Sequence, residues 1–421
     1  LGILAASGLL PQRDRPAMTV VGGLSLDGSV PPMHGLLPIA ASARRTAHGA
    51  LMFPAANLSE AGIVEQLRLF PVGCLWDAVR LLSATNPSPT PAPSGSEPEP
   101  AHADDLADVC GQLTARRALE LAAAGAHHLL LTGPPGAGKT MLARRLPGLL
   151  PPLTLDEALA VTTIHSVAGL LPSGSGLVTT RPFRAPHHTC SDVALVGGGS
   201  VPRPGELSLA HCGVLFLDEL PEFGRRVLET LRQPLESGAV HIARASRTMT
   251  FPARVTFVAA MNPCPCGFFG DARRSCRCAP AAIDRYSRRL SGPLRDRIDL
   301  AVEVQAVPWR DLRQAAAPEP SAPVRDRVVG ARERQLRRQP CLNAQLEGRV
   351  LHNACQLDGP GERLLERAAR RLGLSARGVT RVLRVARTVA DLAHSDAVVE
   401  THIAEALQFR LATREESQYG N

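Results

Sequence analysis

The segment GPPGAGKT, from Gly133 to Thr140, has the residue types and spacing of a phosphate-binding loop. An apolar run directly before it predicts a buried strand, and the pattern G-x-x-x-x-G-K-T lets backbone N–H groups surround a phosphate chain. Lys139 would contact the β- and γ-phosphates, and the Thr140 hydroxyl would bind Mg²⁺. The predicted contacts of a nucleoside triphosphate are Gly133, Pro134, Pro135, Gly136, Ala137, Gly138, Lys139 and Thr140.

Lys139 is the only lysine among the 47 lysines and arginines of the sequence. Arginine carries the positive charge everywhere else, but a planar guanidinium does not fit among phosphate oxygens as a compact ammonium does. By chance, the four fixed positions of the motif recur in about one or two per cent of chains of this length. A single lysine makes such a match rarer, and we interpret the segment as a nucleotide site.

Polar side chains end two further apolar runs. Asp218 and Glu219 close VLFLDE, and on a buried parallel strand they would reach the sheet edge beside the phosphate loop. Asp218 would hold Mg²⁺ through water, and Glu219 would orient and polarise the attacking water. Asn262 closes RVTFVAAMN, and its amide could bind the γ-phosphate or that water. The alternatives are a strand that ends in a charged turn and an ordinary Asn-Pro turn.

Four cysteines follow Asn262 as C-x-C, nine residues and a second C-x-C, namely Cys264, Cys266, Cys276 and Cys278. Four thiolates on one short loop can close a tetrahedral Zn²⁺ site and fold a loop that has almost no core. Free or redox-active thiols are the alternative. The same loop carries Arg273, Arg274 and Arg277, which would present positive charge to nucleic-acid phosphates.

The bulk composition indicates a globular chain with an acidic partner. The 421 residues are 44% hydrophobic and carry a net charge of +8, and nucleic acid is the commonest partner of a basic chain. No run of eighteen apolar residues occurs, so we expect no membrane span. Ten cysteines in a chain of this size do not resemble a secreted disulfide framework, and we expect reduced or metal-bound thiols in the cytoplasm.

The elements that must position these residues alternate over 102–310. Strands at 127–133, 213–219 and 254–262 alternate with helical patterns, which predicts an α/β fold with a parallel sheet covered by helices. A Pro/Ala break opens the region 311–421, which reads as helical and Arg-rich. A helix at 375–394 would gather apolar residues on one face and Arg377, Arg381 and Arg384 on the other. For Arg381 and Arg384 a solvated stripe is the alternative.

Residues 1–85 form a smaller α+β unit. The turn pair Asp27-Gly28 predicts a hairpin, a helix and a strand follow within 36–54, and 61–70 reads as a further helix. The opening LGILAASGLL reads as the middle of an element, so we expect this unit to be partial. A Pro/Ser/Glu linker, 86–101, separates it from the rest of the chain.

Several segments together resemble one known family, the ComM/YifB family of magnesium-chelatase-like AAA+ ATPases. They are RPFRAPHHT (181–189), VGGG (196–199), PRPGELSLAHCGVLFLDELPEF (202–223), NPCPCG (262–267) and SGPLRDRIDL (291–300). The resemblance covers nearly the whole chain. It implies an AAA+ P-loop core with a helical lid, an N-terminal Lon-protease-like domain of the ribosomal S5 type, and a ring, usually hexameric, that moves along DNA with ATP and Mg²⁺.

Two other functions compete with this DNA motor. A magnesium-chelatase ATPase subunit, acting as a chaperone-like activator, would not be expected to carry the Lon-like segment or the four cysteines. A Lon-type protease would need a Ser–Lys dyad, and residues 1–85 contain no lysine. Arg44 and Arg45 lie near the position of such a lysine, but a guanidinium cannot serve as a general base.

The resemblance also implies roles for residues outside the phosphate loop. Arg297 matches the arginine that completes a neighbouring subunit's site, with an ion pair to Asp296 or Asp299 as the alternative. Arg377 matches the lid arginine that contacts the γ-phosphate. The hairpin expected at 236–252 would project into the ring pore, where Arg244 and Arg247 could grip DNA phosphates. For His187-His188 we favour loop structure or DNA contact over a metal site.

Overall fold

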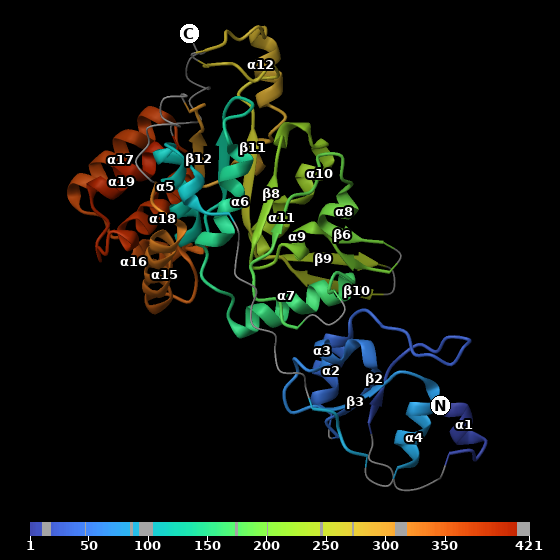
Figure 1. Ribbon diagram of the computed structural model, residues 1–421. Helices are drawn as coiled ribbons and strands as arrows, with labels where there is room; N and C mark the ends of the chain where they lie inside the picture. Colours follow the sequence, from blue (N-terminus) through green and yellow to red (C-terminus); the bar gives the residue numbers. More distant parts are fainter. Residues whose placement is uncertain are drawn as a thin grey trace. The chain divides into compact units, whose positions relative to one another are not determined.

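The structure is a computed structural model that describes residues 1–10, 18–46, 48–84, 87–91, 104–172, 176–199, 201–244, 247–271, 273–307 and 318–410; the side chains of Arg244 and Arg247 are outside this description. The chain forms two compact units (Figure 1). The first comprises Leu1–Glu99 and Leu153–Thr179, and the second Pro100–Pro152 and Thr180–Asn421. Residues 153–179 thus group with the N-terminal part, although the sequence placed them within 102–310.

The second unit is built on a five-stranded parallel sheet in the order β12-β4-β11-β8-β5. The strands are β4 (Leu129–Thr132), β5 (Phe183–Arg184), β8 (Val214–Leu217), β11 (Thr256–Met261) and β12 (Leu300–Glu303). Every residue of β8 and β11 is buried, as expected for central strands covered on both faces. The α/β parallel sheet and the three strands expected from the sequence are confirmed.

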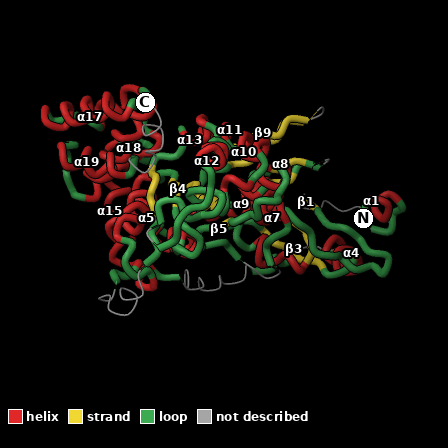
Figure 2. The backbone as a smooth tube through the Cα atoms, turned by 90° about the horizontal axis from the view of Figure 1, so that it is seen from above, coloured by secondary structure: helices red, strands yellow, loops and turns green. Residues whose placement is uncertain are grey.

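Alternation along the strands divides the core of this unit in two. Leu129 and Leu131 of β4 belong to one hydrophobic cluster and Leu130 to the other, because successive side chains point to opposite faces of a sheet. Helix α5 and the lid helices lie on one side of β4, and α10 and α11 on the other (Figure 2). These helices and their neighbours are α5 (Leu113–Gly125), α6 (Lys139–Leu149), α8 (Asp192–Val196), α9 (Glu206–Leu209), α10 (Arg225–Thr230), α11 (Arg232–Ser237), α12 (Pro280–Ser287) and α13 (Gly292–Arg295).

Two antiparallel pairs extend from this unit. The hairpin expected at 236–252 is present as β9 (Ala239–Arg244) and β10 (Arg247–Pro252), with Arg244 opposite Arg247 in register. A shorter pair joins β6 (Gly197–Gly198) to β7 (Arg203–Pro204). Short 3₁₀ turns, η2 (Leu106–Asp108), η3 (Leu220–Glu222) and η4 (Asn343–Gln345), occupy connections of the same unit.

The lid is a group of five helices that shares its core with the sheet. They are α15 (Ser321–Arg338), α16 (Gly348–Ala354), α17 (Gly359–Leu372), α18 (Ala376–Leu392) and α19 (Glu400–Gln408). The Ser375 side chain caps α18 by accepting from the Gly378 amide, and α18 buries Val382, Ala386 and Val389 in the same cluster as β4. The predicted helix at 375–394 and its apolar face are therefore confirmed.

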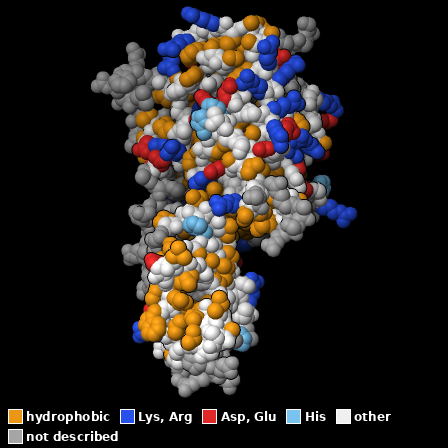
Figure 3. Space-filling model, turned by 90° about the vertical axis from the view of Figure 1, so that its right-hand side faces the viewer, with side chains coloured by type: hydrophobic (Ala, Val, Ile, Leu, Met, Phe, Trp, Pro, Cys, Tyr) orange, Lys and Arg blue, Asp and Glu red, His pale blue; other side chains and the backbone are white. Residues whose placement is uncertain are grey.

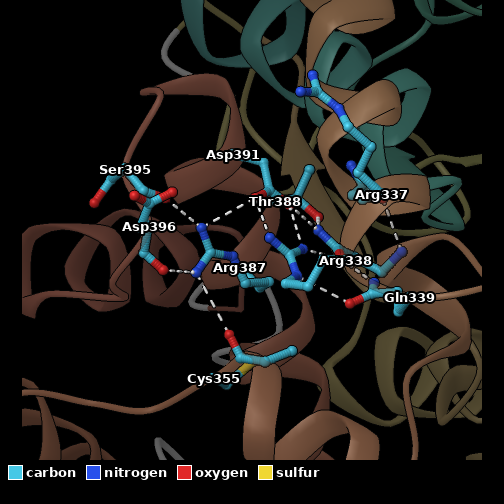
Figure 4. A network of polar contacts seen from close by, with 12 residues as sticks. Arg337, Arg338, Gln339, Cys355, Arg387, Thr388, Asp391, Ser395 and Asp396 are labelled. Carbon is cyan, nitrogen blue, oxygen red and sulfur yellow. Dashed lines mark hydrogen bonds and ion pairs between the residues drawn. The ribbon is translucent and has the colours of Figure 1, made fainter.

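A buried charge network links α18 to α15 (Figure 4). Asp391 accepts two hydrogen bonds from the Arg338 guanidinium, at 2.7 and 2.8 Å, and lies 3.0 Å from Arg387. Asp391 and Arg387 are each 1% exposed. Because removing a charged group from water is costly without a partner, this network is a set of mutually dependent groups.

A second buried polar contact joins the sheet to α18. His127, two residues before β4, lies 3.1 Å through Nδ1 from Asp299 and 2.7 Å through Nε2 from the Thr388 hydroxyl. Burial opposes ionisation of Asp299, but the hydrogen bond and charge of His127 prevail and lower the pKa of this carboxyl. His127 therefore ties the start of β4 to the lid.

The first unit has a three-stranded parallel sheet in the order β1-β2-β3. Its elements are α1 (Gly2–Ala6), β1 (Thr19–Val20), α2 (Leu36–Arg44), β2 (Ala50–Pro54), η1 (Ala55–Asn57), α3 (Leu58–Ala61), β3 (Arg68–Val72), α4 (Leu75–Ser83) and α7 (Leu155–Ala168). Helix α2 packs on α3 and α7. Part of the expected linker adds to this sheet, because the Thr90 amide donates to the Leu69 carbonyl at 2.8 Å.

Two predictions for this unit are wrong. Asp27-Gly28 does form a tight turn, but β1 before it pairs in parallel with β2 rather than in a hairpin. The helix expected at 61–70 is instead the end of α3 followed by β3. Gln66 adopts a φ of +62°, which a helix cannot contain, and Leu69 and Phe70 are buried on the sheet.

Candidate functional site

The phosphate loop connects β4 to the N-terminus of α6. Gly136 and Gly138 have φ values of +75° and +89°, a left-handed conformation that favours glycine. The Gly133 amide donates to the Met261 carbonyl at 3.2 Å, and a Cβ at Gly133 would lie 2.1 Å from the Val304 carbonyl oxygen. The loop is thus held against two neighbouring strands, while a Cβ at Gly136 would meet open space. This is the cradle that a phosphate chain requires.

Lys139 is the first residue of α6 and is buried within the loop. Its Nζ donates to the carbonyl oxygens of Gly133 and Pro134 at 2.6 and 2.9 Å, and to Asn262 Oδ1 at 3.1 Å. Burial lowers the pKa of the ammonium, and the charges of Asp218 and Glu219 oppose that shift. The structure therefore brings together the lysine at the start of α6 and the asparagine that follows β11.

Thr140 and Asp218 are also in direct contact. The Thr140 hydroxyl donates to Asp218 Oδ2 at 2.6 Å, and the Glu219 amide donates to Asp218 Oδ1 at 2.9 Å. A hydroxyl beside a carboxylate is an oxygen donor set that suits Mg²⁺. Glu219 itself has a φ of +51°, a conformation that costs a non-glycine residue about 1–3 kcal/mol. Because of this left-handed conformation, the chain changes direction at Glu219, two residues after β8 ends.

His188 belongs to the site, although the sequence did not predict this. Its Nδ1 lies 3.3 Å from Glu219 Oε2, its ring meets Phe223 edge-on at 6.4 Å, and it packs on His187 at 4.1 Å. The only signal in the sequence was its position in RPFRAPHHT, for which we favoured loop structure or DNA contact. His188 is instead placed to hold the carboxylate that would act on water.

The four cysteines gather into one cluster. Cys264 Sγ lies 3.3 Å from Cys266 Sγ and 3.7 Å from Cys276 Sγ, and all four sulfurs lie within 4.8 Å of one another. Four sulfurs bound 2.3 Å from one zinc ion would lie about 3.8 Å apart, so the cluster fits a tetrahedral site. The backbone amides of Arg277 and Phe268 lower the pKa of Cys266 to about 6, whereas burial raises the pKa of Cys264, and the pKa values of Cys276 and Cys278 are raised as well, so the sulfur–sulfur distances rather than the pKa values support a metal site.

Arg297 lies apart from the phosphate loop's contacts and has partners in its own chain. It forms an ion pair with Glu236 and donates to the carbonyls of Arg232 and Pro293 at 2.9 and 2.6 Å, leaving its side chain 13% exposed. The alternative pairing with Asp296 or Asp299 is wrong, because Asp296 pairs with Arg381 and Asp299 with His127.

Two arginines of α18 differ from the expected stripe. Arg381 is 4% exposed and donates to the Ile298 carbonyl and to Asp296, and Arg384 donates to the Leu346 carbonyl at 2.7 Å. The solvated alternative for these two side chains is therefore wrong, since both are used in packing. Arg377, in the first turn of α18, is exposed and forms no ion pair among the described residues.

The predicted nucleic-acid contacts are only partly described. Arg273 is exposed, and the Arg274 guanidinium lies 5.1 Å from the centre of the Phe268 ring. Arg244 and Arg247 are opposite each other in register at the end of the hairpin where β9 is connected to β10, but their side chains are outside the described residues. On the face drawn in Figure 3, basic side chains are spread over the second unit with acidic side chains among them.

Comparison with known proteins agrees with this geometry. Residues 105–312 match the family model described as magnesium chelatase, subunit ChlI, and residues 318–410 match its C-terminal model. The chain is 42% identical to the competence protein ComM of Haemophilus influenzae over 98% of this chain and 82% of that protein. It is 43% identical to YifB of Salmonella typhimurium over 98% of this chain and 81% of that protein.

A more distant relative is the magnesium-chelatase 38 kDa subunit of Rhodobacter capsulatus, 25% identical over 73% of this chain and 86% of that protein. The helices of the described ranges are each too short or too polar to cross a lipid bilayer. The sheet order, the phosphate loop and these matches together assign the chain to the ComM/YifB family of magnesium-chelatase-like AAA+ ATPases.

Proposed function

We propose that this chain binds ATP with Mg²⁺ and hydrolyses it. The observation that carries the proposal is the convergence of three strand ends, where Lys139 contacts Asn262 and Thr140 contacts Asp218. Bound Mg²⁺, held by Thr140 and Asp218, would neutralise charge on the phosphates. Lys139 and Asn262 would bind the terminal phosphate, and Glu219 would orient and polarise the attacking water.

We further propose that the chain acts as a homo-oligomeric ring, hexameric by analogy with its family, on branched or single-stranded DNA in the cytoplasm. The competence protein ComM is a relative at 42% identity, the chain has a net charge of +8, and the β9–β10 hairpin of the second unit has an arginine on each strand at its connected end. The work would be branch migration or unwinding during DNA uptake and recombination.

In such a ring, Arg297 would complete the neighbouring subunit's site and Arg377 would contact the γ-phosphate from the lid. Arg297 would then have to exchange its pair with Glu236 for the neighbour's phosphate. Arg244, Arg247, Arg273 and Arg274 would hold DNA through its phosphates without reading its sequence.

The second candidate is an ATPase subunit that activates a partner enzyme, as in magnesium chelatase. The matches to both magnesium-chelatase models favour it. Against it are the lower identity to the Rhodobacter subunit and the four-cysteine cluster. We also propose that the unit of residues 1–85 is a Lon-protease-like domain without protease chemistry, because it contains no lysine.

We propose Zn²⁺ as the ligand of Cys264, Cys266, Cys276 and Cys278, on the strength of their sulfur–sulfur distances. Elemental analysis of the purified chain tests this assignment. One zinc per chain, lost in Cys264→Ser, is the expected result, and a metal-free protein whose stability is unchanged by Cys264→Ser would remove the claim.

The motor proposal is tested by ATP turnover with and without forked or single-stranded DNA. We expect turnover in the wild type, stimulation by DNA, and loss of turnover in Lys139→Ala. The same samples, sized with and without nucleotide, report ring assembly. If the chain hydrolyses ATP but DNA neither binds to it nor stimulates turnover, the motor proposal is refuted and the activating subunit is favoured. If there is no turnover at all, the ATPase assignment is refuted.

A further inference from the structure

The loop that carries the cysteines lies directly against the phosphate loop. Gly267 follows Cys266, is buried, and has a φ of +83°. A Cβ at this position would lie 2.5 Å from Pro135 Cδ and 2.8 Å from Pro135 Cγ, closer than such atoms can approach. The backbone at Gly267 therefore packs on the ring of Pro135, in the centre of GPPGAGKT.

Two further contacts connect the same two segments. The Met261 carbonyl accepts from the Gly133 amide, and Asn262 Oδ1 accepts from Lys139 Nζ. The segment 261–267 thus contacts the phosphate loop at three places. Met261 contacts Gly133, Gly267 contacts Pro135, and Asn262 contacts Lys139. Cys264 lies between these points and shapes the turn, because its carbonyl accepts from the Gly267 amide at 2.9 Å and its sulfur from the Phe269 amide at 3.3 Å.

Little other than the cysteines fixes this loop. Among the described residues from 263 to 279, none lies in a helix or strand, and only Cys264 and Gly267 are buried. A segment without a core or a backbone ladder has low local stability unless it is cross-linked. A metal bound by both C-x-C pairs would supply that cross-link, since binding energy at such a site is folding energy.

We propose that the cysteine cluster is a metal-dependent brace for the phosphate loop, so that zinc binding and nucleotide binding strengthen each other. This inference rests on the proposed zinc and ATP occupancy and goes beyond both. Bound zinc would fix the positions of Cys264 and Cys266. The turn from Cys264 to Gly267 would then keep its shape, and Gly267 would stay packed on Pro135. Coupling between two sites is reciprocal, and its usual size corresponds to about 5- to 150-fold in affinity.

A matched pair of glycine variants tests the contact without removing a cysteine. Gly267 and Gly270 have φ values of +83° and +79°, so alanine strains the backbone equally at both positions. Only the Cβ at Gly267 meets Pro135, because a Cβ at Gly270 meets nothing within 4 Å. We expect Gly267→Ala to weaken binding of a fluorescent ATP analogue at least about fivefold, with zinc content unchanged, and Gly270→Ala to weaken it less than twofold.

A double-variant cycle identifies the atoms responsible. In a Pro135→Ala background the Cγ and Cδ atoms that collide with the new methyl group are absent. We therefore expect Gly267→Ala to cost less than twofold in nucleotide affinity in that background. An equal cost with and without Pro135 would overturn the brace, because the effect would then arise from backbone strain alone.

The metal side of the coupling is measured on the full chain with a zinc-selective chelator that leaves Mg²⁺ bound. We expect saturating ATP analogue to slow zinc release from the wild type at least about fivefold, and Cys276→Ser/Cys278→Ser to lose zinc and weaken nucleotide binding by a similar factor. Zinc release that is independent of nucleotide, with normal affinity in the cysteine variant, would overturn the brace while leaving both sites in place. Wild-type protein that lacks zinc, or that fails to bind nucleotide, would refute the underlying proposals instead.

Discussion

Replacement of Asp391 by asparagine tests whether the buried charge network holds the lid together (Figure 4). The substitution keeps the size of the side chain but removes its charge, and it places an amide N–H₂ group against donors of Arg338 or Arg387. Arg387 is 1% exposed and its pKa is lowered by burial, an effect that Asp391 opposes. Removing one partner of a buried pair costs about 3–5 kcal/mol.

A matched control lies on the neighbouring helix. Glu366 and Arg370 of α17 form an i,i+4 pair like that of Arg387 and Asp391, but their side chains are 59% and 79% exposed. Exposed pairs of this spacing contribute about 0.3–0.5 kcal/mol. Glu366→Gln therefore changes the same kind of interaction in water, and the difference between the two variants measures the effect of burial.

The suitable assay is hydrogen exchange of the α18 backbone amides, because a chain with two compact units need not unfold in one step. At 1.4 kcal/mol per factor of ten, Asp391→Asn should accelerate this exchange by roughly 100- to 3,000-fold. Glu366→Gln should change it less than about threefold. Comparable effects of the two variants, or an Asp391→Asn effect below about tenfold, would refute the reasoning.

Three further outcomes are expected. His188→Ala should lower the ATP turnover number by about 2- to 5-fold, the value of one partly exposed ion pair, and leave KM unchanged because His188 contacts Glu219 rather than the loop; a change mainly in KM would contradict this. Lys139→Arg should weaken ATP-analogue binding at least about tenfold despite the retained charge, as titration can show. Asp299 has its pKa lowered below the ordinary 3.8, so its stabilising effect is present above that value and lost as pH falls further. The Asp299→Asn variant should therefore lose less stability than the wild type when the pH falls from about 5 to 3, as thermal unfolding of both proteins at several pH values can show.

The nucleotide site could be predicted because its signals are local. Each strand that positions it is a short apolar run, and each polar residue follows its strand directly, as Asp218 follows β8 and Asn262 follows β11. In a parallel sheet the strand ends share one edge, so sequence order alone indicates that these side chains meet. The four cysteines were predictable for the same reason, since all lie on one loop.

What the sequence could not reveal depends on contacts between distant segments. The periodicity of α18 placed Arg381 opposite the apolar face, but nothing in that pattern indicated that Asp296 and the Ile298 carbonyl would cover it. His188 meets Glu219 because it follows β5, which pairs in parallel with β8, and a strand of two residues leaves no pattern in the sequence. At 61–70 a short apolar run fitted a helix or a strand equally well, and the left-handed Gln66 decided between them.

Residues 153–179 give the first unit a discontinuous sequence, which decides how the chain can be truncated. The Ser166 hydroxyl on α7 and the Leu37 amide on α2 both donate to the buried Glu60 carboxylate, so the two segments complete one another. Removing residues 1–99 would leave α7 and its apolar face without the segment on which they pack. Residues 1–99 are therefore not a domain that can be removed cleanly from the rest of the chain. The polypeptide crosses between the two units three times, at residues 99–100, 152–153 and 179–180, so no single cut in the chain separates them.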